Sequence, residues 1–203
     1  MRTTLTRINA FVRSAACGLA ALAFAMAGAK ACAASASASV PFDETTRLVL
    51  VKRGAVVSAQ LAGRTTKVMG VDPALRSAIA SADEYFVVGR KPVHEGERVF
   101  VLLVTVTPSR AGRPTGFCGA GTEDALRLVE VNGRQRRLTQ VSSMLLQSCT
   151  KNFALGDDSG TTLRSRLEGA TDPGHIGLTW LDHPVLGSGP RTIVIQGQSL
   201  VAQ

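Results

Sequence analysis

The sequence lacks an apolar run long enough to cross a bilayer as a helix. Its apolar stretch near the N-terminus, residues 15–28, has 14 residues and is mostly alanine, whereas a spanning helix needs about 20 strongly apolar residues. Arg2, Arg7 and Arg13 precede this stretch, and a tract of small residues, 29–38, follows it. A basic start, a short apolar middle and Ala-x-Ala sites are typical of a secretory signal peptide. We therefore expect residues 1–38 to be a signal peptide and the mature chain to be periplasmic or secreted, without a transmembrane segment.

The small-residue tract offers several cleavage positions. Small residues occupy both of the positions that cleavage requires at four places: after Ala31, Ala33, Ala36 and Ala38. We favour Ala36 or Ala38, because Lys30 lies close to the earliest site. In a lipoprotein Cys32 would be acylated, but Lys30 places a charge where such signals carry small, uncharged residues.

Once the signal is removed, little excess charge remains. The full chain has 23 basic and 15 acidic residues and a formal charge of +8. Four of the basic residues, Arg2, Arg7, Arg13 and Lys30, lie in the signal, which leaves +4 for residues 39–203. Nucleic-acid-binding domains usually have a clustered basic face and a higher charge. We therefore predict no nucleic-acid partner, and a single domain of ordinary size.

Cysteine is scarce, with four residues in the whole chain. Cys17 and Cys32 lie in the expected signal, so the mature chain keeps Cys118 and Cys149. Two cysteines in an oxidising compartment are most simply one disulfide. It would close a loop of about 32 residues, and the chain-entropy model values such a bridge at roughly 3.7 kcal/mol.

Recognisable catalytic, metal and cofactor motifs are lacking too. His94, His175 and His183 form no cluster with metal-ligand spacing, and neither a Walker Lys-Ser/Thr nor a Gly-x-Gly-x-x-Gly pattern appears. Residues 156–160, Gly-Asp-Asp-Ser-Gly, resemble a serine-protease loop but carry an additional Asp, and we interpret them as a polar turn. Asp182 and His183 are adjacent, so a strand would point them to opposite sides. We predict no catalytic, cofactor or metal residues.

Helical periodicity is almost absent from the mature chain, because no stretch after residue 40 keeps apolar residues at helical spacing for more than about two turns. Short runs of Val, Leu, Ile and Thr, separated by Gly, Pro, Asp and Asn, indicate strands. We predict them at residues 47–52, 55–61, 84–89, 98–107, 125–131, 137–147, 161–167, 176–181 and 192–196, with Leu200 and Val201 as a possible extension of the last. Asp72 and Pro73 favour one helix start, because Asp caps free amides and Pro has a preset φ. That helix should end near Ala80.

Residues 99–106 are apolar at almost every position, as in a central strand covered on both faces. A second sheet, the short helix or a partner chain must supply the second cover. We therefore predict a mainly β fold: an antiparallel β-sandwich or a barrel-like sheet with one short helix.

Asn132 and Gly133 form the strongest local turn signal, since both tolerate the positive φ of a type I′ hairpin. A two-residue loop pairs Val131 with Arg134, and the same register carried outward places Cys118 opposite Gln147, near Cys149. The disulfide would then clip the open end of a long hairpin.

Residues 117–124 read Phe-Cys-Gly-Ala-Gly-Thr-Glu-Asp and are the most distinctive segment. Residues 116–150 resemble uncharacterised exported proteins of Gram-negative bacteria, in which a Cys-Gly-Ala-Gly turn and an acidic pair lead into an apolar strand that returns to a second cysteine, here Cys149. The resemblance implies no activity, and it supports the bridge.

Two stretches make up the candidate interaction surface. Around the first cysteine, the Gly119 and Gly121 amides could form a small anion-binding concavity, although Glu123 and Asp124 would repel an anion and a tight turn explains the glycines equally. At the predicted hairpin tip, a basic run is either solvated or in contact with an acidic partner or an anionic lipid surface. This run comprises Arg134, Arg136 and Arg137.

The sequence thus predicts an exported, non-enzymatic β-rich binding protein that acts through contacts with another protein, as an inhibitor, immunity protein or assembly factor. The alternative is a small secreted hydrolase that uses His183 or His175 with a carboxylate.

Overall fold

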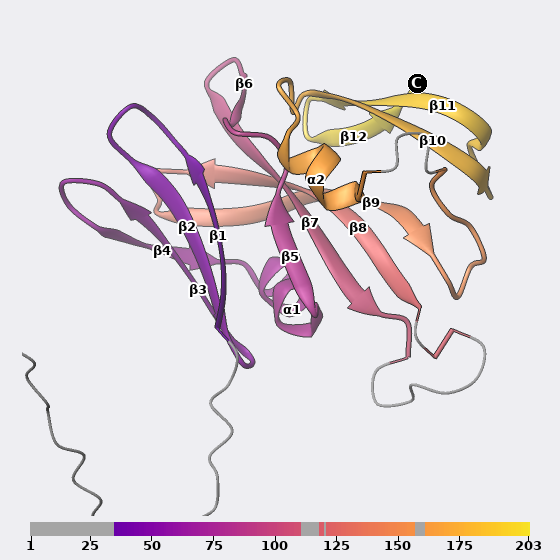
Figure 1. Cartoon of the computed structure of the whole chain (residues 1–203). Coiled ribbons are helices and arrows are strands. Elements are labelled where there is room, and N and C mark those ends of the chain that lie inside the picture. Colours follow the sequence, from indigo (N-terminus) through magenta and orange to yellow (C-terminus); the bar gives the residue numbers. More distant parts are fainter. Residues whose placement is uncertain (1–34, 111–117, 120, 157–160) are drawn as a thin grey trace, which may run out of the picture. The chain divides into compact units, whose positions relative to one another are not determined.

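The computed structural model describes residues 35–110, 118–119, 121–156 and 161–203, which belong to one compact unit, Ala33–Gln203. Most of the expected signal peptide and most of the 156–160 turn lie outside the described residues. The described part is mainly β, as predicted, and combines a barrel-like sheet with a small antiparallel sheet (Figure 1). It contains two short helices where the sequence predicted one.

Eight strands form the barrel-like sheet. In spatial order they are β1 (Ser35–Pro41), β2 (Arg47–Arg53), β3 (Val56–Ala62), β4 (Lys67–Val71), β9 (Arg137–Ser148), β8 (Thr122–Asn132), β7 (Arg98–Pro108) and β5 (Glu84–Val87). The short strand β6 (Val93–Glu95) also pairs with β7. The ring nearly closes, because the Tyr85 hydroxyl of β5 lies 2.8 Å from the Ala36 carbonyl of β1 and 3.2 Å from that of Leu50.

Of the two predicted architectures the barrel-like sheet is the one formed, and it is mixed rather than purely antiparallel. β4 and β9 pair in parallel through Gly70 and Val71 of β4. A hairpin cannot join parallel strands. Here one helix and strands β5 to β8 lie between β4 and β9 in the sequence, so the chain has the length to return alongside β4 in the same direction.

The first core fills the inside of the barrel. Alternate residues of the strands point inward, as with Leu48 and Leu50 of β2. Helix α1 (Pro73–Ser81) packs against this core through Leu75 and Ile79, which lie one turn apart. The Asp72 carboxylate accepts from the Ala74 and Leu75 amides at 2.8 and 3.2 Å. The predicted helix start is therefore confirmed.

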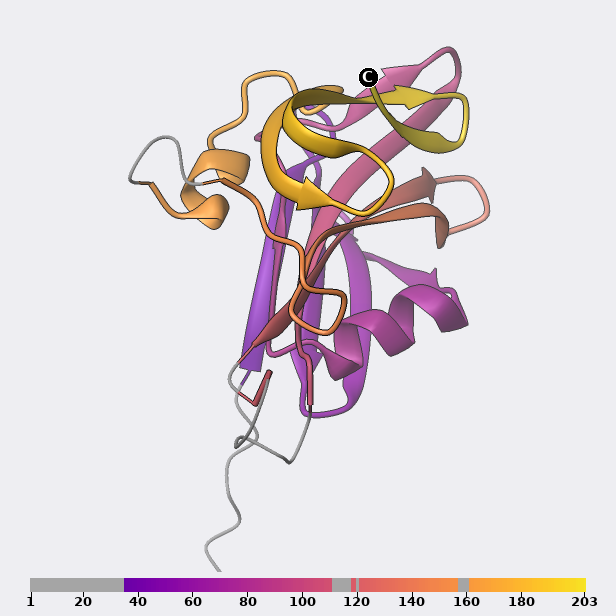
Figure 2. The same cartoon turned by 90° about the vertical axis from the view of Figure 1, so that its right-hand side faces the viewer.

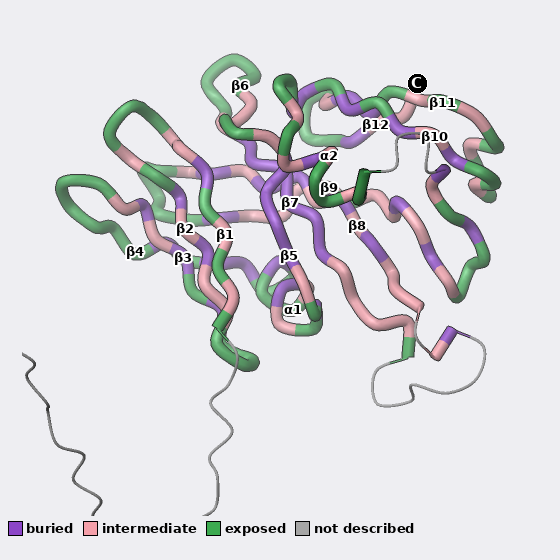
Figure 3. Tube along the Cα trace, viewed as in Figure 1, coloured by how far each residue is buried: buried purple, intermediate pink, exposed green. Residues whose placement is uncertain are grey.

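The second core lies on the outer face of the same central strands. Phe100, Leu102 and Val104 of β7 point to it, whereas Val101 and Leu103 point into the barrel. It is covered by α2 (Leu163–Glu168) and by a sheet of β10 (His175–His183), β11 (Gly187–Gln196) and β12 (Ser199–Ala202). Figure 2 shows this sheet and α1 on opposite sides of the barrel strands. The prediction that β7 is covered on both faces is confirmed (Figure 3).

The predicted strand 161–167 is wrong, because α2 occupies most of it. The Thr162 hydroxyl accepts from the Ser165 amide at 3.1 Å and caps the helix. Arg164 and Glu168 form an i,i+4 ion pair of 2.9 Å along it, and Leu167 is buried in the second core. Capping and tertiary burial therefore outweigh the strand-like appearance of so short a segment.

The predicted hairpin register is wrong by four residues. The loop between β8 and β9 holds residues 133–136, and Val131 pairs with Leu138 instead of Arg134. The Asn132 side chain accepts from the Gln135 amide at 2.8 Å, which builds a wider turn. Arg136, with φ of 53°, takes the left-handed conformation that the prediction gave to Asn132 and Gly133.

Three strands, β1, β4 and β6, were not predicted. β1 consists of Ser, Ala, Val and Pro, a composition with little strand propensity, and it holds its place by pairing along its whole length with β2. β12 is a separate strand rather than an extension of β11, because Gly197, with φ of 63°, reverses the chain between them.

Candidate functional site

The structure divides the predicted interaction surface between the two ends of the β8–β9 hairpin. Gly119, Gly121, Glu123 and Asp124 lie at its open end, beside the disulfide, and the basic run lies at its turn. The 11 residues of β8 separate these ends by roughly 30 Å. They are therefore two sites, which we call the disulfide end and the barrel mouth.

The disulfide end is closed by the Cys118–Cys149 bridge, with Cα atoms 5.6 Å apart, so the predicted pairing is confirmed. Cys118 has a positive φ of 61° and lies outside the β8 ladder, which explains why the bridge forms although the predicted register fails. Gly121 packs directly on the bridge, since a Cβ there would lie 2.7 Å from the Cys149 Sγ.

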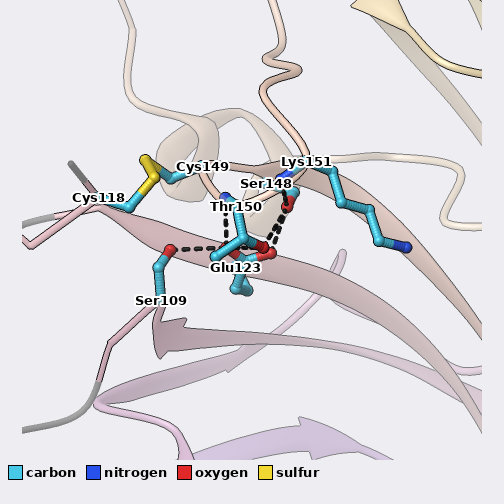
Figure 4. The surroundings of a disulfide bond; sticks show 7 residues. All are labelled: Ser109, Cys118, Glu123, Ser148, Cys149, Thr150 and Lys151. Carbon is cyan, nitrogen blue, oxygen red and sulfur yellow. Dashed lines mark hydrogen bonds between the residues drawn. A yellow bond between two sulfur atoms is a disulfide. The ribbon is translucent and has the colours of Figure 1, made fainter.

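Glu123 joins the chain segments around the disulfide (Figure 4). Its carboxylate accepts from the Ser109 hydroxyl at 2.6 Å, from the Thr150 amide and hydroxyl at 3.0 Å each, and from the Ser148 hydroxyl. Partial burial raises the pKa of Glu123, but these hydrogen bonds together outweigh burial, and the pKa lies below its usual range. Lys151 points away from this carboxylate.

Asp124 is buried, with 4% of its surface exposed, so it is not available to a partner. One oxygen accepts from the Gln147 amide group at 2.6 Å, and the other has no hydrogen-bond partner. Burial raises the pKa of Asp124, and the charges of Glu84 and Glu123 raise it further. The Gly121 amide donates to the Cys118 carbonyl at 3.3 Å. The disulfide end thus has a structural role. Its Gly121 amide already has an acceptor and is not free to bind an anion.

Of the two histidines of the hydrolase alternative, one is held by backbone amides and the other has a carboxylate partner at the surface. The Nδ1 atom of His183 accepts from the Val185 and Leu186 amides at 3.2 and 3.0 Å, and its ring packs edge-on against Trp180. Burial lowers the pKa of His183, as does the charge of Lys151. His175 pairs with Asp172 at 2.9 Å on an exposed turn. Neither histidine lines the main cavities found among the described residues.

A smaller cavity of about 480 Å³ lies next to the disulfide end. It is lined by Phe153, Ala154, Leu181 and Asp182, together with the neighbouring ends of β8 and β9. Leu181 is 62% exposed at its edge. Among the described residues of its lining, Asp182 is the one ionisable side chain, and Thr122, Gln147, Ser148 and Asn152 are polar.

The barrel mouth holds a cavity of about 1140 Å³. The connections β1–β2, β3–β4, β6–β7 and β8–β9 surround it. Phe42, Leu61, Val99 and Val131 supply apolar side chains to its lining. Five exposed basic residues also line it: Arg64, Lys67, Arg98, Arg134 and Arg136.

The five basic side chains of the barrel mouth outnumber the acidic side chains beside them. Among the described residues, none of them takes part in an ion pair, because the salt bridges found there involve only Arg164 and His175 as cations. Three acidic residues share the lining. Asp43 accepts from the Thr45 amide at 2.8 Å, and Glu130 accepts from Gln198 at 3.2 Å, so both face neutral groups. Glu97 is the third. The cavity keeps a net positive lining.

Sequence reasoning found Arg134 and Arg136 but missed Arg64, Lys67 and Arg98. These three lie in or beside other connections, and closure of the barrel brings them together with the β8–β9 turn. The available signal was weak: each basic residue lies beside a turn. Arg137, the third member of the predicted basic run, is exposed but does not line the cavity.

No cluster of three or more His, Cys, Asp or Glu that could hold a metal ion occurs in the described ranges. Within those ranges, neither helix has the length and apolar character to span a bilayer.

Comparison of the chain with protein-family models, with curated proteins and with solved structures finds no match. The functional interpretation therefore depends on the geometry above.

Proposed function

We propose that this protein is an exported, non-enzymatic binding protein whose barrel mouth holds an acidic segment of another protein, as an inhibitor, immunity protein or assembly factor would. One observation carries the proposal. Basic side chains in and beside three connections converge on one cavity. Among the described residues, none of them forms an ion pair with an acidic side chain. A folded protein that holds such charges unpaired presents a positive field to its surroundings.

The shape of the barrel mouth favours a protruding partner segment over a flat surface. A volume of about 1140 Å³ is large enough for several side chains. Phe42 and Val131 offer apolar contact within the cavity, and the guanidinium groups lie on exposed residues around it. A loop with carboxylates flanking an apolar side chain would contact both the apolar lining and the surrounding basic groups. Arginine forks bind carboxylates in a bidentate manner, which adds geometric specificity to the charge attraction.

Site-directed photo-cross-linking of the full chain, expressed for export, tests this proposal. A photoreactive residue replaces exposed Gln135, between the two arginines of the β8–β9 turn, and in the control it replaces exposed Arg53, at the opposite end of β2. We expect the probe at Gln135 to give an adduct with one protein of defined mass and the probe at Arg53 to give none. Equal adducts from both positions, or an adduct with lipid alone, contradict the proposal.

Charge reversal at the barrel mouth provides a second test of the proposal. Arg98→Glu with Arg134→Glu should reduce the Gln135 adduct at least about tenfold, because charges at the rim of an interface chiefly govern the association rate. The matched control is Arg53→Glu with Arg90→Glu, which makes the same change of net charge at exposed residues outside the barrel mouth. An adduct that survives reversal at the mouth, or falls equally in the control, refutes the assignment of this surface.

A further inference from the structure

The N-terminal strand β1 is an integral part of the barrel. Its seven residues pair with all seven of β2, from Ser35 opposite Arg53 to Pro41 opposite Arg47. Ala36, Ala38 and Val40 point toward the barrel core, and the serines between them point outward. Val40 is 1% exposed. The strand therefore closes one side of the core rather than lying loosely over it.

β1 also forms the seam that nearly closes the ring. Tyr85 is buried, and its hydroxyl donates a hydrogen bond to the Ala36 carbonyl at 2.8 Å. A chain that began after Ala36 would lack this carbonyl and would leave the residues of β2 opposite Ser35 and Ala36 unpaired. Unpaired strand edges invite association with other chains. A mature protein that keeps the whole strand avoids this exposure.

The cysteines place a second limit on the mature N-terminus. Cys118 and Cys149 pair with each other, so a retained Cys32 would have no intramolecular partner. An odd thiol in an oxidising compartment is open to exchange with the existing disulfide or to pairing between chains. Cleavage after Ala31 keeps Cys32, and cleavage after Ala36 or Ala38 truncates β1.

We infer that the exported chain is processed between Ala33 and Ala34. Among the four positions with small residues, this is the one that removes Cys32 and retains all of β1. The inference rests on export, which is part of the proposed function. The reaction is hydrolysis by a signal peptidase: the Ala33–Ala34 amide breaks, water supplies the hydroxyl of the new Ala33 carboxyl group, and Ala34 becomes the free amino terminus. The positions favoured from the sequence, Ala36 and Ala38, lie within β1.

Intact mass and N-terminal sequencing of the native exported protein test the site. We expect residues 34–203 with one disulfide and no thiol that alkylates without reduction. A start at residue 32, 37 or 39, or a lipid on Cys32, overturns the site while leaving export and binding at the barrel mouth intact. An uncleaved chain that stays in the cytoplasm overturns export as well, so the two failures are distinguishable.

Two precursor variants isolate the bond. Ala33→Leu places a large side chain at the position before the proposed bond, so the mature form that starts at Ala34 should be lost. Ala29→Leu is the matched control, because it alters a position needed only for cleavage after Ala31, and it should leave processing unchanged. Both changes lie outside β1 and the rest of the described fold. Unchanged processing in Ala33→Leu refutes the inference.

Discussion

At the residue scale, two neighbouring carboxylates near the disulfide, Glu123 and Asp124, have pKa values shifted in opposite directions. Glu123 accepts four hydrogen bonds from Ser109, Ser148 and Thr150 and is held ionised. Asp124, the next residue, points to the other side of β8 and is buried with one oxygen unpartnered. Strand alternation alone separates the two environments. An acidic pair in a sequence therefore does not define one acidic site.

Substitution of these two carboxylates should affect stability differently. The pKa of Glu123 is lowered on folding, so its stabilisation is present above the unfolded value near 4.5 and is lost as the pH falls below it. The pKa of Asp124 is raised, so ionisation of Asp124 weakens the fold as the pH rises through and above 3.8. We expect Glu123→Gln to destabilise the protein at pH 7 and Asp124→Asn to leave it equally or more stable. Urea unfolding at pH 7 and pH 3.5 measures both, and destabilisation by Asp124→Asn at pH 7 would be inconsistent with this assignment.

Gly121 should tolerate no side chain, because its missing Cβ is the space that the disulfide fills. The built Cβ position lies 2.6 Å from the Cys149 Cβ and 2.7 Å from its sulfur. We expect Gly121→Ala to lower the free energy of unfolding by about 1–3 kcal/mol, as overpacking does. Gly133→Ala is the control, since nothing lies within 4 Å of the corresponding position. Equal losses for both variants in urea unfolding would show that glycine flexibility, rather than contact with the bridge, sets the effect.

At the element scale, the sequence located most strands and one helix from composition and periodicity. Residues 98–107 were predicted as a strand, with 99–106 covered on both faces, and β7 matches. The wrong or missing predictions concern segments whose secondary structure depends on contacts with other parts of the chain. Residues 161–167 become α2 because Leu167 enters the second core and Thr162 caps the helix. β1 becomes a strand through pairing with β2. In such short segments the sequence periodicity is too weak to predict the secondary structure, and the tertiary contacts determine it.

The β8–β9 hairpin should lose stability, but not its binding surface, when the disulfide is removed. The bridge joins residues 31 apart in the sequence, and the chain-entropy model assigns roughly 3.7 kcal/mol to a loop of this size. We expect Cys118→Ala with Cys149→Ala to lower the melting temperature and to retain the Gln135 adduct below the new transition. The adduct lies at the hairpin turn, roughly 30 Å away along β8. Loss of the adduct in protein that is still folded would show that the two ends are coupled.

At the scale of the whole described unit, two cores share one set of strands. Leu103 of β7 faces the barrel interior, Leu102 faces the outer sheet, and both are fully buried. Because the same backbone supports both cores, we expect them to unfold together. The small sheet of β10 to β12 is thus a cover for the barrel rather than an independent domain.

This sharing predicts a single unfolding transition. Leu102→Ala and Leu103→Ala should each cost about 2–5 kcal/mol, because each leaves a cavity in a fully buried site. Tryptophan fluorescence, which reports Trp180 in the second core, and circular dichroism, which reports the whole sheet, should give coincident curves in both variants. Separate transitions in the Leu102 variant would mean that the outer sheet unfolds by itself.

The sequence by itself determined the β-rich class, the α1 start at Asp72 and the pairing of Cys118 with Cys149, because local periodicity, capping and cysteine count are properties of nearby residues or of composition. Only the tertiary structure decided the closure of the barrel, the parallel pairing of β4 with β9 and the meeting of Arg64 and Arg98 with Arg134. These depend on contacts between segments far apart in the chain. No local pattern encodes which distant strand edges will meet, so the cavity at the barrel mouth becomes visible only when the ring has formed.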